Sequence, residues 1–133
     1  MKKVLLIAAI ALMFAGCAAT ETDNGGNDMY MRRLLSASEA KEKMQNNPDV
    51  IILDVRNRNE FLSGHIPGAL LLPEFEIAEN VDTILPDTNA LILVYCRSGV
   101  RSRNAVVLLV SLGYTNVYDF GGIINWPYDI VMP

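Results

Sequence analysis

One cysteine in this sequence of 133 residues stands among residues that favour its reactive form. Cys96 follows an apolar run, and Arg97, Gly99 and Arg101 come within the next five residues. The arginines attract negative charge, and the glycine permits a tight turn in which successive backbone N–H groups converge on one point. A helix that begins beside such a turn adds further positive potential. Because the thiolate is the nucleophilic form of cysteine, Cys96 is predicted to be reactive rather than an inert core residue.

Two elements are expected to hold Cys96 in place, a buried strand before it and a helix after it. Residues 91–95 are apolar throughout, which is typical of a strand at the centre of a parallel sheet. A helical pattern of apolar residues covers residues 103–112, and Gly113 is suited to end that helix. The turn between strand and helix would therefore present its backbone to the sulfur.

The rest of the sequence alternates helices and strands. Ser36 with Glu39, and Asn57 with Glu60, have the spacing of capping boxes at the start of two short helices. Apolar runs predict strands near residues 33–35, 50–53, 69–72 and 117–120 besides the one before Cys96. This alternation predicts an α/β domain with a mainly parallel sheet.

Three motifs in this order resemble those of the rhodanese, or sulfurtransferase, family. They are Asp-Val-Arg and Gly-His-Ile-Pro-Gly-Ala at residues 54–56 and 64–69, Cys-Arg-Ser-Gly-Val-Arg-Ser at residues 96–102, and Gly-Gly at residues 121–122, followed by Trp126. The resemblance implies one rhodanese-like domain over residues 32–133, built on a five-stranded, mainly parallel sheet flanked by helices.

The resemblance also implies an activity, the transfer of sulfane sulfur. Cys96 would take the outer sulfur of an anionic donor such as thiosulfate, hold it as a persulfide, and pass it to a thiol or another small nucleophile such as cyanide. The loop would bind this sulfur through Arg97, Ser98, Gly99, Val100, Arg101 and Ser102. The sequence contains no metal-ligand spacing and no organic-cofactor motif, so neither group is expected to take part.

Within the loop, the charged and hydroxyl residues are given different tasks. Arg97 would attract the donor at the loop mouth, whereas Arg101 would brace the loop by pairing with a carboxylate. Ser98 and Ser102 are placed to donate hydrogen bonds, and Ser102 could equally be the N-cap of the following helix. Outside the loop, Asp54 and Arg56 are expected to form a structural ion pair at the carboxyl end of their strand.

His65 and Trp126 are given structural roles. His65 is the only histidine and lies between a glycine and Ile-Pro, where a supporting role is favoured over general-base catalysis. Trp126 is interpreted as core packing rather than as a substrate platform.

Two other functions are compatible with a reactive loop of this kind. One is phosphatase or arsenate-reductase chemistry, but the loops of those related enzymes have five residues between cysteine and arginine, whereas four separate Cys96 from Arg101. The other is a non-catalytic docking module at a membrane, which the presence of Cys96 disfavours. A formal charge of −4 without a basic run gives no indication of nucleic-acid binding.

The N-terminus has the form of a bacterial lipoprotein signal. Residues 1–16 contain a basic start, an apolar core too short to span a bilayer, and small residues before Cys17. This pattern predicts cleavage before Cys17 and lipidation of it, an extracytoplasmic domain anchored to a membrane, and a flexible tether over residues 17–31. The alternative is an ordinary secretory signal with a chance cysteine. If Cys17 carries lipid, Cys96 is the only free thiol, so dithiol chemistry is excluded.

Overall fold

Four short parallel strands form the centre of the protein, in the computed structural model that describes residues 25–133. Their order across the sheet is β2-β1-β3-β4. The strands are β1 Ile51–Asp54, β2 Leu70–Leu71, β3 Ile92–Cys96 and β4 Val117–Gly122. Because all strand pairs are parallel, their carboxyl ends meet at one edge of the sheet, where Asp54, Cys96 and Gly122 lie.

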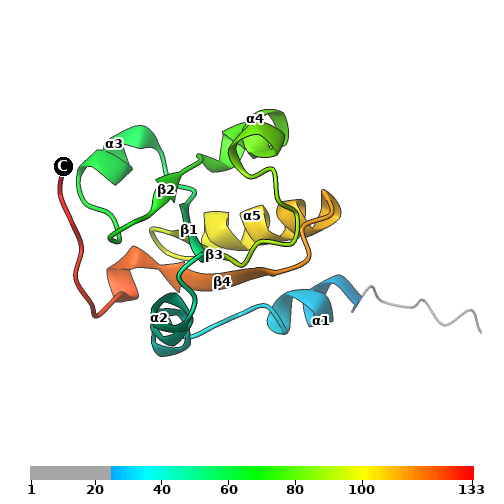
Figure 1. Cartoon of the computed structure of the whole chain (residues 1–133), viewed down its shortest axis with the longest axis horizontal. Helices are drawn as coiled ribbons and strands as arrows, with labels where there is room; N and C mark the ends of the chain where they lie inside the picture. Colours follow the sequence, from blue (N-terminus) through cyan, green and yellow to red (C-terminus); the bar gives the residue numbers. More distant parts are fainter. Residues whose placement is uncertain (1–24) are drawn as a thin grey trace, which may run out of the picture.

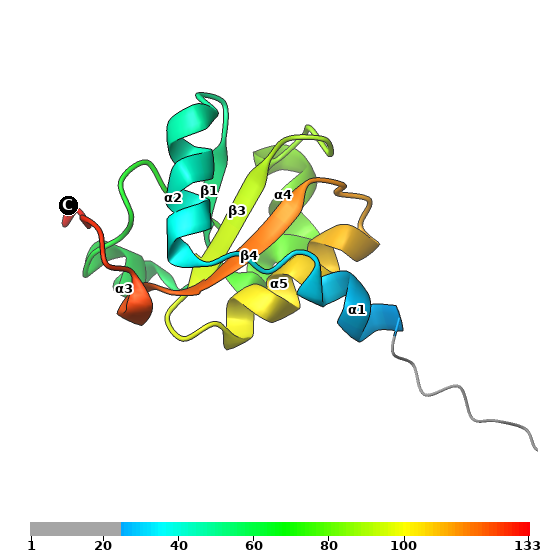
Figure 2. The same ribbon diagram turned by 90° about the horizontal axis from the view of Figure 1, so that it is seen from below.

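Helices cover both faces of this sheet (Figures 1 and 2). Helix α2 lies on one face, whereas α4 and α5 lie on the other, and α1 lies beside α5 near the β4 edge. The α-helices are α1 Gly25–Met31, α2 Ala37–Asn46, α3 Arg58–Leu62, α4 Ile77–Ile84 and α5 Val100–Ser111. Two 3-10 helices, η1 Glu74–Glu76 and η2 Ile123–Asn125, complete the chain.

Alternation along β3 divides the core into two clusters. Ile92, Val94 and Cys96 pack with residues of α4 and α5, whereas Leu93 and Tyr95 pack on the opposite face, toward α2. All five side chains are fully buried. Cys96 therefore points into the layer between the sheet and α5, and not toward α2.

Both predicted capping boxes are present. The Ser36 hydroxyl accepts the Glu39 N–H while the Glu39 carboxylate accepts the Ser36 N–H, so α2 begins where the sequence indicates. Asn57 and Glu60 form the same reciprocal pair at the start of α3. Gly113 follows α5 with a φ of 98°, as expected of a residue that ends a helix in the left-handed conformation.

The predicted five-stranded sheet is wrong by one strand. Within residues 25–133 the sheet has four strands, and the segment expected to be the first makes only an isolated bridge from Leu34 to Asp119. Two backbone hydrogen bonds join it to Asp119, from Leu35 N–H and to Arg33 C=O. The segment cannot extend further because α1 ends at Met31 and Ser36 already caps α2.

The predicted tether is too long at its C-terminal end. Helix α1 occupies Gly25–Met31, and its Tyr30 side chain is buried against the domain. The physical reason is a tertiary contact, since Tyr30 packs into the cluster beneath α5. The signal segment and Cys17 lie outside the described residues. In residues 25–133, no helix has the length and apolar character needed to cross a membrane.

Helix α5 begins earlier than its apolar pattern predicts. It starts at Val100, with Gly99 as the residue before it, rather than at residue 103. Gly99 has a φ of 105°, so the turn from β3 is completed in the left-handed conformation before the apolar stripe begins. Ser102 and Arg101 are thus within the first turn of the helix.

Candidate active site

The Cys96 sulfur lies at the base of the loop that joins β3 to α5. Cys96 is fully buried, and the Gly99 N–H donates a hydrogen bond to its Sγ at 3.0 Å. The thiol in turn donates to the Ser102 hydroxyl oxygen at 3.5 Å. The loop therefore curls around the sulfur and brings a backbone donor to it, as the sequence motif predicts.

Ser102 is a buried link in this loop and not the helix N-cap. Its hydroxyl donates to the Gly99 carbonyl at 3.1 Å and lies 3.4 Å from the Gly121 carbonyl. The residue is fully buried. The N-cap alternative is wrong because α5 already begins at Val100, which places Ser102 where its hydroxyl faces the sulfur.

The end of β4 forms the support beneath the loop. Gly122 pairs with Cys96 in the sheet, and a Cβ atom on Gly122 would overlap the Arg97 carbonyl and lie 2.7 Å from the Ser98 Cα. The Ile124 N–H donates to the Arg97 carbonyl at 3.3 Å. A side chain at position 122 would thus displace the loop, which explains the need for glycine there.

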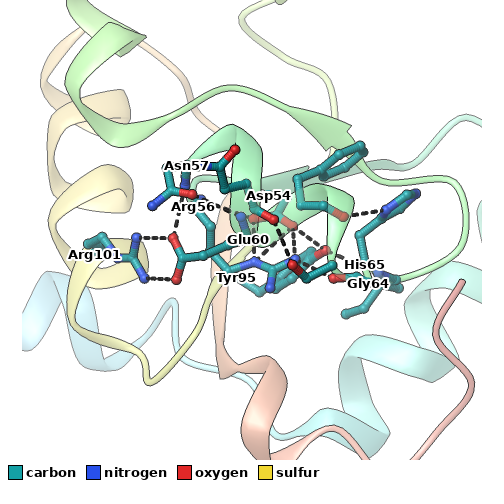
Figure 3. A network of polar contacts seen from close by, with 12 residues as sticks. Asp54, Arg56, Asn57, Glu60, Gly64, His65, Tyr95 and Arg101 are labelled. Atoms are coloured by element: carbon teal, nitrogen blue, oxygen red, sulfur yellow. Dashed lines mark hydrogen bonds and ion pairs between the residues drawn. The ribbon is translucent and has the colours of Figure 1, made fainter. Parts of the chain in front are cut away.

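Arg101 is held by Glu60, the residue of α3 that forms the capping box with Asn57 (Figure 3). The two guanidinium nitrogens donate to the two carboxylate oxygens at 2.7 and 2.8 Å. Hydrogen bonding from Arg101, aided by the Asn57 N–H, lowers the pKa of Glu60 to about 2. The predicted pairing of Arg101 with a carboxylate is therefore found, and the charged pair anchors the first turn of α5 to α3.

A second polar network lies beneath the strand that carries Cys96 (Figure 3). Asp54 and Arg56 form a buried ion pair at 2.7 Å, as predicted, and Arg56 also donates to the Gly64 carbonyl at 2.7 Å. The Tyr95 hydroxyl donates to Asp54 at 2.6 Å and accepts the Ile66 N–H at 3.1 Å. Burial, then the bond to Asp54, raises the pKa of Tyr95, so its hydroxyl remains a donor. The network fixes the residue directly before Cys96.

His65 is placed away from any catalytic task. Its Nδ1 lies 3.0 Å from the Phe61 carbonyl, and its ring stacks on the Phe61 ring with centroids 3.8 Å apart. Trp126 is half-buried and contacts Phe120 and Tyr128 through its ring. These contacts agree with the structural roles predicted for both residues.

The outer face of the loop is open to solvent. Arg97 and Ser98 are exposed, and the Val100 side chain is 66% exposed. Arg97 is thus exposed at the loop mouth, while Arg101 is held by Glu60. The loop separates an exposed cationic mouth from a shielded sulfur.

Three residues near the loop were not singled out from the sequence: Tyr95, Tyr30 and Asp119. Tyr95 lies in an apolar run, and a tyrosine in a buried strand needs a hydrogen-bond partner, which was the available signal. Asp119 lies in a strand and is fully buried, so its carboxylate also requires donors. Tyr30 lies near the end of the segment expected to be a tether, among apolar and basic residues, and carried no such signal.

The arrangement suits single-cysteine nucleophilic chemistry. Within residues 25–133, Cys96 is the free cysteine, shielded and hydrogen-bonded by its own loop. A sulfur so placed can attack an electrophilic sulfur and hold the product out of bulk water.

Comparison with known proteins agrees with this geometry. Residues 36–127 match the family model described as the rhodanese-like domain. The thiosulfate sulfurtransferase PspE of Escherichia coli is 37% identical over 81 residues, which cover 61% of this chain and 74% of PspE. A sulfurtransferase of Allochromatium vinosum is 34% identical over 93 residues, covering 69% of this chain and 85% of the relative.

Solved structures give the same result. A structure described as rhodanese with anions from E. coli is 32% identical and superposes with a TM-score of 0.59, covering 63% of this chain and 99% of that one. A rhodanese-related protein from Thermoplasma volcanium is 31% identical with a TM-score of 0.67, covering 76% and 99%. The fold, the loop and the matched residues lead to one conclusion: this chain belongs to the rhodanese-like domain family.

Proposed function

We propose that the protein is a sulfurtransferase that carries sulfane sulfur as a persulfide on Cys96. The observation that carries the proposal is the position of Sγ, fully buried at the base of the turn between β3 and α5, where the Gly99 N–H donates to it. The names of the relatives from E. coli and A. vinosum support the same activity.

The proposed reaction has two displacement steps. The Cys96 thiolate attacks the outer sulfur of thiosulfate, a new S–S bond forms, and the bond to the central sulfur breaks so that sulfite leaves with the electron pair. A thiolate or cyanide then attacks the outer sulfur of the persulfide and removes it, and the Cys96 thiolate is restored. The donor in this scheme is an anion, for which exposed Arg97 provides the attracting charge at the loop mouth.

The geometry of the loop favours binding of a sulfur atom over binding of a phosphate group. Four residues lie between Cys96 and Arg101, and the loop closes so tightly that Gly99 N–H and the Ser102 hydroxyl both contact Sγ. Arg101 is directed toward Glu60, to which both of its terminal nitrogens donate, and not toward the sulfur. The loop is therefore better suited to bind the terminal sulfur of a persulfide than a tetrahedral oxyanion.

The test is steady-state kinetics with two substrate classes. Turnover of thiosulfate with cyanide is expected, with the parallel-line pattern of ping-pong kinetics, and hydrolysis of a phosphate ester is expected to be absent. The Cys96→Ser protein is the control and should have no turnover. Phosphate-ester hydrolysis without sulfur transfer would overturn the proposal in favour of phosphatase chemistry.

We also propose that the mature protein is held at the extracytoplasmic side of a bacterial membrane through lipid on Cys17. The support is the signal-like pattern of residues 1–16 and the small residues that precede Cys17. In that setting the acceptor of the sulfur would be a small nucleophile or a partner thiol that can reach the loop mouth.

A further inference from the structure

Helix α1 lies outside the residues that match the rhodanese-like family model, yet it is bound to the catalytic half of the domain. The family match begins at residue 36, whereas α1 covers Gly25–Met31. The Tyr30 side chain is 7% exposed, and the Arg103 guanidinium of α5 lies 4.7 Å from the centre of its ring. Arg103 also donates to the Asn27 side chain at 3.1 Å. Helix α1 is thus docked on α5 by specific contacts.

The Tyr30 hydroxyl reaches a fully buried carboxylate on β4. It donates to Asp119 Oδ2 at 2.6 Å, while the Gly121 N–H donates to Oδ1 at 2.8 Å. Asp119 forms no ion pair with any side chain in residues 25–133, although it is fully buried. Since a buried carboxylate is costly without hydrogen bonds, the Tyr30 hydroxyl and the Gly121 N–H are both needed to keep it in place.

Gly121 connects this carboxylate to the catalytic loop. Its carbonyl lies 3.4 Å from the Ser102 hydroxyl, and its Cα lies 3.7 Å from the position of a Cβ atom built on Gly99. Gly99 and Ser102 are the residues that contact the Cys96 sulfur. A continuous path of contacts therefore leads from Tyr30 through Asp119 and Gly121 to the sulfur.

Tyr30 is also close enough to Cys96 for the charge of Cys96 to affect the pKa of Tyr30. The pKa of Tyr30 is raised, chiefly by burial, then by the hydrogen bond and charge of Asp119, and to a smaller degree by the charge of Cys96. Tyr30 and Asp119 share with the loop residues Ser98 and Gly99 the walls of one open pocket of about 640 Å³. Both residues thus border the space beside the loop.

We infer that Tyr30 and Asp119 are positioning residues for the Cys96 loop, and that α1 is a working part of the sulfurtransferase although it precedes the family domain. The inference rests on the proposed function, since its consequence is a faster sulfur transfer. The pair acts through Gly121: it fixes the end of β4, which holds Gly99 and Ser102 against the sulfur. Neither residue has to touch the substrate.

The test compares Tyr30→Phe with a matched control, Tyr114→Phe, in the full chain. Tyr114 is likewise buried and donates its hydroxyl to the Leu85 carbonyl, but its partners lie on α4 and the residue after it. Removal of one hydroxyl hydrogen bond in Tyr30→Phe should lower kcat by roughly threefold to tenfold, with the KM for thiosulfate changed less than about twofold. Tyr114→Phe should melt at a lower temperature and retain the kcat of the wild type.

One further measurement and one further variant separate a positioning role from a merely structural one. Because Cys96 is fully buried, a loop that has lost its support should expose the sulfur, so iodoacetamide should alkylate Cys96 roughly threefold faster or more in Tyr30→Phe. Asp119→Asn, which keeps the shape of the side chain, should have the same two effects. If Asp119→Asn does not fold, Tyr30→Phe alone decides.

The outcomes are distinct from those for the proposed function. Wild-type kcat and wild-type alkylation in Tyr30→Phe would overturn the positioning role while leaving sulfur transfer intact. Equal losses of kcat in Tyr30→Phe and Tyr114→Phe would also overturn it, because they would show general destabilisation. If the wild type showed no sulfur transfer but Cys96 were still alkylated faster in Tyr30→Phe, the proposed function would be refuted. The conclusion that Tyr30 supports the loop would stand.

Discussion

Glu60 and Arg101 are joined by two hydrogen bonds, although they lie 41 positions apart in the sequence. The same carboxylate also accepts the Asn57 N–H at 3.0 Å, so it caps α3 while it holds Arg101 (Figure 3). Arg101 is the second residue of α5 and marks the end of the catalytic loop. The Glu60 side chain thus fixes the position of the loop relative to α3.

Replacement of Arg101 should affect the fold and the activity together. Arg101→Ala is expected to lower the free energy of unfolding by about 1 kcal/mol, since the pair is partly exposed, and to lower kcat about tenfold through displacement of the loop. Arg97→Ala, in the same loop but exposed, should instead raise the KM for thiosulfate and leave the melting temperature unchanged. Thermal melts and kinetics of both variants test this, and an Arg101→Ala protein that equals the wild type in both would show that the brace is dispensable.

Acid should weaken the contribution of this pair within a defined pH window. The folded-state pKa of Glu60 is about 2, below its ordinary value of 4.5, so the stabilisation is complete above pH 4.5 and is lost as the pH falls toward 2. Glu60→Gln cannot form the charged pair at any pH. The difference in unfolding free energy between wild type and Glu60→Gln, measured by denaturant titration from pH 6 to pH 2, should therefore shrink through that window. If this difference in unfolding free energy stayed constant over the whole pH range, Glu60 would not be the group with the lowered pKa.

The contact between Gly122 and the loop predicts a steric effect on activity. A Cβ at position 122 would overlap the Arg97 carbonyl, so Gly122→Ala should displace the loop and reduce kcat at least about tenfold. Gly68→Ala is the control: Gly68 has a φ of 81° and no atom within 4 Å of the Cβ position, so its substitution strains the backbone away from the loop. It should lower stability but keep kcat. Full activity in Gly122→Ala would mean that the loop does not depend on the end of β4.

Cys17 should decide where the protein resides. Cells that express the wild type are expected to hold sulfurtransferase activity in the membrane fraction, because two or more acyl chains anchor a protein stably. Cys17→Ala should release or mislocalise the protein without changing the activity of the domain. Wild-type protein found in the soluble fraction, with Cys17 unmodified, would support an ordinary secretory signal instead.

The sequence predicts the parts of this site that are local. The strand before Cys96, the turn at Gly99, the two capping boxes and the end of α5 at Gly113 all depend on residues within a few positions of one another. The sequence alone is compatible with two roles for Ser102, hydrogen-bond donor and N-cap, because a serine before an apolar helical stripe is also typical of an N-cap, and the structure confirms the first. Only the left-handed Gly99 moves the start of the helix to Val100.

The parts that the sequence did not predict depend on distant contacts. The hydrogen bond from Tyr30 to Asp119 joins residues 89 positions apart, and Tyr30 belongs to a helix in a segment that was expected to be a tether. The partner of Arg101 was predicted as a carboxylate without being identified, because Glu60 already had a local task as a helix cap. The prediction of a fifth strand was wrong because α1 and α2 occupy the residues on either side, so that only Leu34 forms a bridge to β4.

The mass of the purified mature protein before and after treatment with thiosulfate reports the Cys96 persulfide most directly. One sulfur atom, about 32 Da, should be added to each wild-type chain, and cyanide should remove it; Cys96→Ser should gain nothing and have no turnover. A Cys96→Ser protein that still transfers sulfur, or a wild type that turns over without ever carrying the added mass, would contradict sulfur transfer through Cys96.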